Sequence, residues 1–288
     1  MPTPKDQLFT GNALGVYRMA RFATQSVYTI APDMIAFASS ISKSELYALP
    51  AGSVAEESRL AMKSAHPRRF FEVLAQLCVL DVWHPELNNL IGVPAGPRGH
   101  HDELDAFVHT MMVLDLIPLS ENTDFDIEVL RWAALTHDLG KALTDKSKWP
   151  SHHGHEERGA VAIERFYERL KLPAYLKQAA LLACVEHLRV HRFLEMGKGK
   201  MVDLIHTADK TKLGAEGLAI VAMADAFGRV AVSKHIDGPN AVLACADAVR
   251  EETGQPIPTN LTGENVGLHI RSCKGNAARR ALKQKGYL

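Results

Sequence analysis

Residues 131–141, Arg-Trp-Ala-Ala-Leu-Thr-His-Asp-Leu-Gly-Lys, constrain this chain more than any other segment. The apolar residues predict a buried helix that ends with the adjacent pair His137 and Asp138. An imidazole beside a carboxylate can bind one divalent cation, and a metal held by such a pair usually takes further His and Asp ligands from other helices. The alternative is a structural pair, satisfied by hydrogen bonds near a helix end.

The residues after this pair fit the end of a helix. Gly140 is predicted to be a left-handed cap. The terminal carbonyls of a helix carry partial negative charge, which favours a cation beside His137 and Asp138. Lys141 could reach a phosphate oxygen or bond these free carbonyls, and the sequence leaves both interpretations open.

The composition is that of an ordinary globular protein of 288 residues, with 47% apolar residues, 23% charged residues and a net charge of zero. No apolar run approaches the roughly 20 residues that cross a bilayer, so no membrane contact is expected. Any nucleic-acid contact must come from local patches. The N-terminus lacks the order of a secretory signal. Widely spaced cysteines predict reduced thiols and a cytoplasmic location: Cys78, Cys184, Cys245 and Cys273.

Helical periodicity extends along the chain and predicts an all-α fold, an elongated helical body that contains a helical core. Three predicted helices carry histidines. The helix at residues 103–117 carries His109, and the helix at residues 126–139 begins at an Asp126 cap. The helix at residues 174–193 places His187 and His191 four residues apart, on one face.

The order of these residues resembles the HD phosphohydrolase superfamily: a His, then the His-Asp pair, then distal histidines and a final Asp. The resemblance implies a first metal site at His109, His137, Asp138 and Asp209. His155, in His-Glu-Glu-Arg-Gly-Ala, matches the superfamily pattern His-x-x-x-Gly-Ala. His155 and His187 are expected to complete a second metal site or to contact phosphate. The alternative for Asp209 is an exposed acid paired with Lys212, and Asp225 with Arg229 is interpreted as an internal ion pair.

Further motifs resemble the neck and body of bacterial tRNA nucleotidyltransferases, the CCA-adding enzymes, in order along nearly the whole chain. They are Arg-Met-Ala-Arg-Phe-Ala at residues 18–23, Thr-Ile-Ala-Pro at 29–32, Arg-Phe-Phe-Glu-Val-Leu at 69–74, His-Pro-Glu-Leu at 84–87, Gly-Val-Pro at 92–94, Thr-His-Asp-Leu-Gly-Lys at 136–141, Trp-Pro-Ser-His-His-Gly-His at 149–155, Ala-Asp-Ala-Phe-Gly-Arg at 224–229 and Ile-Pro-Thr at 257–259. The resemblance implies three parts: a neck and body at residues 1–95, an HD phosphohydrolase domain at 96–233, and a helical tail with a basic patch at 234–288.

The nucleotidyltransferase head of this family precedes the neck and carries a Gly-Ser followed by an Asp-x-Asp. Gly52-Ser53 has no Asp-x-Asp at a suitable distance, and Asp124-Phe125-Asp126 is interpreted as a helix cap. The neck also departs from the usual Asp-Pro-Leu-Arg, because residues 12–15 are Asn-Ala-Leu-Gly. We therefore expect the head to be missing and this chain alone to transfer no nucleotides.

Basic residues and two histidines are the predicted contacts to RNA or phosphate. The segment at residues 271–285 holds six cations and no acids, and it could grip an RNA backbone or form a solvated terminal helix. His152 and His153 could touch substrate or cap a helix. The predicted RNA or phosphate contacts are His152, His153, Arg18, Arg21, Arg271, Lys274, Arg279 and Arg280.

The resemblance implies a metal-dependent phosphodiesterase and phosphatase in tRNA processing, acting on 2′,3′-cyclic phosphates and phosphomonoesters at RNA ends or on free nucleotides. Its divalent ion would be Ni²⁺, Mn²⁺, Mg²⁺ or Co²⁺, since mixed nitrogen and oxygen sites accept several metals. One alternative is a tRNA-binding subunit with an idle HD site that partners a separate nucleotidyltransferase head. Another is a nucleotide or cyclic-dinucleotide hydrolase. The predicted catalytic residues are His137, Asp138, Lys141, His155 and His187.

Overall fold

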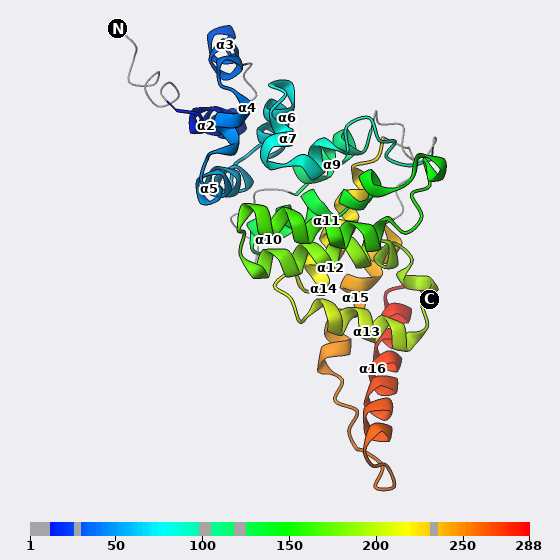
Figure 1. The fold of residues 1–288 in the computed structure, drawn as a ribbon. Helices are drawn as coiled ribbons and strands as arrows, with labels where there is room; N and C mark the ends of the chain where they lie inside the picture. Colours follow the sequence, from blue (N-terminus) through cyan, green and yellow to red (C-terminus); the bar gives the residue numbers. More distant parts are fainter. Residues whose placement is uncertain (1–11, 26–29, 98–104, 118–124, 231–235) are drawn as a thin grey trace.

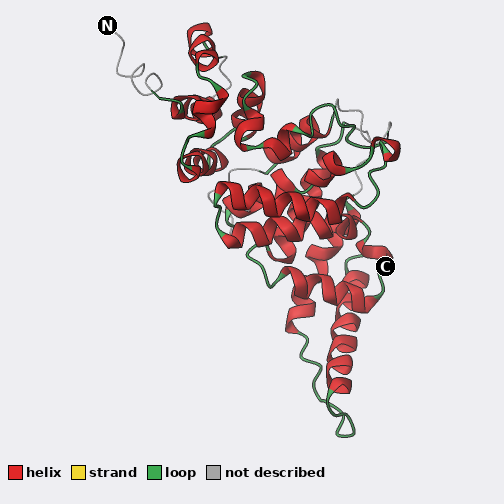
Figure 2. Ribbon diagram, in the orientation of Figure 1, coloured by secondary structure: helices red, strands yellow, loops and turns green. Residues whose placement is uncertain are grey.

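The computed structural model describes residues 12–25, 30–97, 105–117, 125–230 and 236–288. Within these ranges all regular elements are helices, which confirms the all-α prediction (Figure 2). No helix in the described part of the chain combines the length and the apolar character that crossing a membrane requires. The position of Asp124 in the predicted Asp-Phe-Asp cap lies outside the described residues, whereas Asp126 does cap the helix that follows it.

The first part of the chain forms a group of short helices at one end of an elongated molecule (Figure 1). Here α2 packs against α5 and α6. Pro32 begins α3, as expected of a proline in a first turn. The elements are α2 (Leu14–Phe22), η1 (Ala23–Gln25), α3 (Pro32–Ser40), α4 (Lys43–Tyr47), α5 (Ala51–Met62), α6 (Arg68–Gln76), α7 (Leu80–Trp83) and α8 (Pro85–Asn88).

The middle of the chain forms a bundle in which α10 packs on α9, α12 and α14, and α11 packs on α12 (Figure 1). Figure 1 shows α16 extending away from this bundle at the opposite end from α3. The elements are α9 (Ala106–Asp115), α10 (Ile127–Thr136), η2 (Leu139–Leu143), η3 (Lys146–Lys148), α11 (His155–Leu170), α12 (Ala174–His191), η4 (Phe193–Glu195), α13 (Lys198–Ala208), α14 (Gly214–Phe227), α15 (Asp237–Glu251) and α16 (Glu264–Gln284). One contiguous cluster of buried apolar side chains extends from Val16 to Leu282.

Arg131 fixes the position of α10 in this bundle. Its guanidinium is buried and donates hydrogen bonds to the carbonyl oxygens of Ile117 (3.0 and 3.1 Å), Met62 (2.7 Å) and Ser64 (2.6 Å). These carbonyls lie at the ends of α9 and α5, where helices leave acceptors without internal partners. The buried charge thus ties α10 to two other helices, and α10 ends at the pair His137 and Asp138.

Gly140 does not form the predicted left-handed cap. It lies inside η2 and has no positive φ. A Cβ atom at this position would lie 1.8 Å from the His155 carbonyl oxygen and 2.5 Å from the Gly159 amide nitrogen. The glycine is therefore required because η2 and α11 approach each other through their backbones, which brings His155 next to Asp138.

We expect Gly140→Ala to lower the free energy of unfolding by about 1–3 kcal/mol, because the added methyl group must push η2 and α11 apart. Gly52→Ala is the matched control, since Gly52 lies in α5 and a Cβ there meets no atom within 4 Å. Chemical denaturation of both variants measures the difference. Equal stability of the two variants would contradict the close-packing argument.

A second stability prediction concerns His84, which is fully buried against the rings of Phe70, Phe71 and Phe166. Burial, with a smaller effect from Arg169, lowers the pKa of His84 to about 3. As the pH falls below about 6.5, His84 becomes protonated in the unfolded chain but stays neutral in the folded chain. The contribution of neutral His84 to the free energy of unfolding is therefore fully present above that pH and is lost as the pH falls toward 3.

Between pH 7 and pH 5 this histidine should remove about 2 kcal/mol from the free energy of unfolding. Urea denaturation of the parent and of His84→Gln at both pH values measures the contribution of His84 to this change in the free energy of unfolding. The parent should lose more stability than the variant over this interval. An identical loss in both proteins would show that His84 is not the responsible group.

Candidate metal centre

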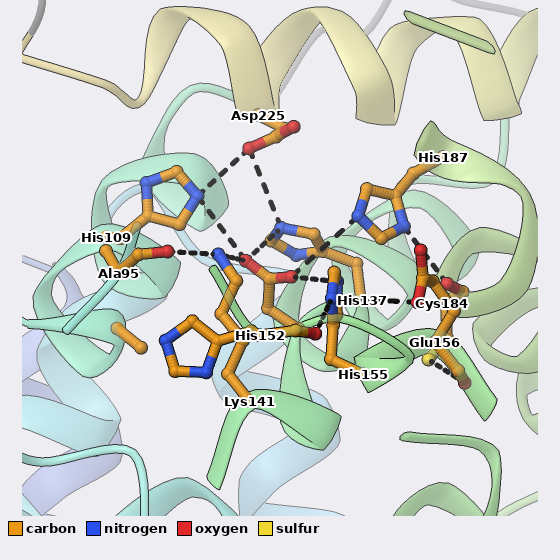
Figure 3. A network of polar contacts seen from close by, with 12 residues as sticks. Ala95, His109, His137, Lys141, His152, His155, Glu156, Cys184, His187 and Asp225 are labelled. Carbon is orange, nitrogen blue, oxygen red and sulfur yellow. Dashed lines mark hydrogen bonds and ion pairs between the residues drawn. The ribbon is translucent and has the colours of Figure 1, made fainter. Parts of the chain in front are cut away.

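A buried cluster of imidazoles and carboxylates lies where α9, α10, α11, α12 and α14 meet (Figure 3). It contains two groups of residues. Within each group the potential ligand atoms lie within 4.8 Å of one another, and Asp138 belongs to both groups. The first group comprises His109, His137, Asp138 and Asp225, and the second comprises Asp138, His155 and His187. Each group offers the mixed nitrogen and oxygen donors that first-row divalent metals accept.

The two oxygens of Asp138 face different groups. Asp138 Oδ2 lies 3.1 Å from His137 Nε2 and 3.7 Å from His109 Nε2. Asp138 Oδ1 lies 3.2 Å from His155 Nε2 and 3.8 Å from His187 Nε2. A carboxylate placed in this way could bridge two cations, the arrangement found in sites that hold a pair of metals.

The backbone orients three of the histidines. Their Nδ1–H groups donate to main-chain carbonyls: His137 to Ala134 at 2.7 Å, His155 to His152 at 3.1 Å, and His187 to Ala183 and Cys184, both at 3.0 Å. Such bonds fix the tautomer and leave the Nε2 lone pair for a metal. All three Nε2 atoms lie within 3.8 Å of an oxygen of Asp138.

Several polar atoms of the cluster are suited to bind a cation. Among the described residues, the buried atoms His137 Nε2, Asp138 Oδ1 and His155 Nε2 form no hydrogen bond of regular geometry, although they face one another across 3.1 to 3.2 Å contacts with Asp138. Buried polar atoms without a regular hydrogen bond are rare and costly. A metal ion would satisfy all three, so the residues present fit such an ion.

Electrostatics also favours a cation here. Burial opposes ionisation of Asp138 and Asp225, but nearby cations hold both carboxyl pKa values well below the usual range. Burial alone would lower the pKa of His137, but the Asp138 carboxylate beside it raises that pKa to about 10. Burial, aided by His137, lowers the pKa of His187 to about 3, so it remains neutral. Two buried anions thus attract positive charge, which a divalent ion could supply in place of a proton.

Lys141 lies at the edge of the first group. Its ammonium group is 2.6 Å from Asp138 Oδ2 and donates a hydrogen bond of 2.6 Å to the Ala95 carbonyl oxygen. The terminal carbonyls of α10, one of the two predicted partners, are therefore not its contact. Lys141 lines a cavity of about 250 Å³ together with Asp138, His155 and His187, where an oxygen of a substrate could approach it.

The structure corrects the expected fourth ligand, because it brings Asp225 and not Asp209 into the cluster. Asp225 Oδ1 lies 3.0 Å from His109 Nε2, and Asp225 Oδ2 lies 2.7 Å from His191 and 2.8 Å from Arg229. The expected ion pair with Arg229 is present, but it is only part of the role of Asp225. The sequence did contain an indication that Asp225 is buried for a functional reason, because it lies in an otherwise apolar helix, α14, whose only other charged residue is Glu216.

Asp209 instead ends α13 and pairs with Arg250 of α15 at 2.7 and 2.8 Å. Its Oδ1 also accepts a bond from the Ala215 amide. Arg250 binds Glu216 as well, so Asp209 joins a network that links α13, α14 and α15. Lys212, the partner suggested by the sequence, lies over the ring of Tyr175.

The predicted RNA or phosphate contacts are mostly engaged within the chain. His152 is buried, with Nε2 bonded to the Pro94 carbonyl at 2.7 Å and Nδ1 to the Thr144 hydroxyl at 2.6 Å, whereas His153 is exposed. Arg18 and Arg21 pair with Glu57, Arg271 with Asp203, and Arg280 with Glu252, and Lys274 donates to the Val249 carbonyl. Arg279 is exposed and forms no ion pair with any described residue.

Comparison with known proteins agrees with this geometry. Residues 106–228 match the model of the HD domain, and all the residues of the cluster lie in that range. A multifunctional CCA protein of Acinetobacter baylyi is 34% identical over 284 residues, which cover 96% of this chain and 67% of that protein. The chain belongs to the family of the multifunctional CCA proteins.

Other members of this family are similarly related. The protein of Mannheimia succiniciproducens is 40% identical over 228 residues, which are 77% of this chain and 54% of that protein. The protein of Hahella chejuensis is 33% identical over 282 residues, which are 94% of this chain and 65% of that protein. The chain thus spans about half to two thirds of the length of these relatives. The family predicted from the sequence motifs is confirmed.

Asp225→Asn and Asp209→Asn form a matched pair of variants that tests the corrected ligand set. Asp225→Asn should lower the affinity for a divalent ion at least tenfold, because it removes a charged ligand from the first group. Asp209→Asn should leave that affinity unchanged. Isothermal titration with Mn²⁺ or Ni²⁺ measures both. Loss of metal by Asp209→Asn alone would restore the ligand set expected from the sequence.

Proposed function

We propose that this chain is a metal-dependent phosphohydrolase that opens 2′,3′-cyclic phosphates and removes phosphate from RNA ends or nucleotides. The observation that carries the proposal is the sharing of Asp138 by two buried ligand groups at the wall of a cavity. A divalent ion bound there would lower the pKa of water and neutralise charge on the phosphoryl oxygens. The HD-domain match supports the same class of reaction.

In this proposal the residues of the site have different roles. His109, His137, Asp138 and Asp225 would hold the first ion, and His155 and His187 would complete a second site or contact the phosphate. Lys141, held by Asp138 and the Ala95 carbonyl, would place positive charge next to a phosphoryl oxygen. Water adds to phosphorus, one P–O bond of the cyclic ester breaks, and the released ribose oxygen takes a proton. The product is a phosphomonoester.

The test is to incubate the protein with a 2′,3′-cyclic nucleotide and Ni²⁺, Mn²⁺, Mg²⁺ or Co²⁺. At least one metal should support turnover, and a chelator should abolish it. The double variant His137→Ala, Asp138→Ala should lose turnover to the background rate, because it removes two shared ligands. His206→Ala, at an exposed position of α13 outside the cluster and the cavity, is the control. Folded, metal-loaded protein that turns over no substrate with any of these metals would exclude this substrate class.

A second function, an RNA-binding body that partners a separate nucleotidyltransferase head, is favoured by one observation. Arg279, Lys283 and Lys285 of the α16 region are exposed and form no ion pair with any described residue. Such free cations could contact an RNA backbone. The double variant at His137 and Asp138 separates the two functions. If it matches the parent in every activity and still binds tRNA, the binding function is the better account.

A further inference from the structure

A second, larger cavity adjoins the metal centre. The cavity beside Asp138 has a volume of about 250 Å³. The larger cavity, about 510 Å³, lies between the end of α12 and the start of α13. Leu188 and Arg229 line both cavities, so the two spaces meet at these side chains. A substrate held at the metal centre could therefore extend into the larger cavity.

Each of the two spaces is lined by a histidine of α12. His187 lines the smaller cavity and lies 3.8 Å from Asp138 Oδ1. His191, one helical turn later, lines the larger cavity and bonds Asp225 Oδ2 at 2.7 Å. Since both carboxylates belong to the metal centre, the larger cavity begins one side chain away from the candidate ligands.

The larger cavity carries more positive than negative side chains. Four cations line it, Arg189, Arg192, Lys200 and Arg229, against two carboxylates, Glu156 and Glu195. Arg229 is already bonded to Asp225, and Arg189 is bonded to Glu186. Lys200 forms no ion pair with any described residue.

Arg192 pairs with Glu195 at 2.9 Å, but these side chains are 75% and 66% exposed. An ion pair in such an exposed position contributes little stability, and an incoming anion can replace it. Lys200 and Arg192 are therefore the cations most available to a ligand in this cavity.

We propose that the larger cavity binds the phosphodiester and the nucleoside that precede the terminal phosphate, so that the preferred substrate is an RNA 3′ end of at least two nucleotides. Lys200 and Arg192 meet the phosphodiester, because Arg and Lys form strong charge-assisted hydrogen bonds to phosphate oxygens. The volume and the apolar side chains of Leu188 and Met196 suit a sugar and base. This inference rests on the proposed phosphohydrolase function.

The test compares a 2′,3′-cyclic mononucleotide with a dinucleotide that ends in the same cyclic phosphate. The parent should show a kcat/KM about tenfold higher for the dinucleotide, the effect of roughly one charge-assisted contact. In the double variant Lys200→Ala, Arg192→Ala this ratio should fall to near one. Lys210→Ala is the control, since Lys210 is an exposed lysine just beyond the other end of α13 and lines neither cavity.

A binding measurement keeps the two proposals separate. In the presence of a chelator, calorimetry with the corresponding 3′-phosphates should give a lower Kd for the dinucleotide than for the mononucleotide, and the double variant should lose the difference. If the parent hydrolyses neither substrate, the proposed function fails, while this comparison still decides the role of the cavity. Equal Kd values for both ligands in the parent would overturn the inference.

A third ligand distinguishes a phosphate group from a complete nucleotide. A mononucleotide 3′-phosphate that also carries a 5′-phosphate monoester offers the charge without the second nucleoside. The dinucleotide should bind more tightly than this ligand, since the cavity also has apolar walls. Equal affinity would show that the cavity takes a phosphate alone and would overturn the assignment of the nucleoside.

Discussion

Two buried carboxylates, those of Asp138 and Asp225, determine how the centre of this protein is built. They are 1% and 2% exposed, and ionised groups so far from water are stable only with close compensating charge. Asp138 receives it from Lys141 and His137, and Asp225 receives it from Arg229 and His191. Of these partners only His191 comes from another helix, α12. Asp225 also contacts His109 of α9, and Asp138 faces His155 of α11 and His187 of α12, so the two carboxylates bring candidate ligands from separate helices together.

Much of the site could be predicted from the sequence because its pattern is local. His137 and Asp138 are adjacent, and the helical period places His187 and His191 on one face, where each reaches one of the two carboxylates. The error at Asp209 has a physical cause. Ala208-Asp209 and Ala224-Asp225 are equivalent dipeptides in neighbouring helices. Only the packing of α14 inside the bundle buries Asp225, while Asp209 ends α13 beside Arg250.

At Gly140 and Lys141, contacts with residues remote in the sequence determine the structure, and the local sequence pattern does not predict them. A glycine after a helix usually permits a left-handed turn, but Gly140 is needed for the close approach of two backbones. Its neighbour Lys141 bonds the Ala95 carbonyl, 46 residues away in the sequence. Neither contact follows from helical periodicity, because each depends on how η2 packs against parts of the chain remote in sequence. The helical class, by contrast, followed directly from that periodicity.

In the proposed site, His109, His137, Asp138 and Asp225 hold one cation between separate helices. Anomalous diffraction from crystals of metal-loaded protein, collected at the absorption edge of the bound metal, would locate that cation. We expect a peak within about 2.0–2.2 Å of His Nε2 and carboxylate oxygen atoms of these four residues. A peak beside Asp209 and Arg250 instead, or none at the cluster in protein shown to contain metal, would contradict it.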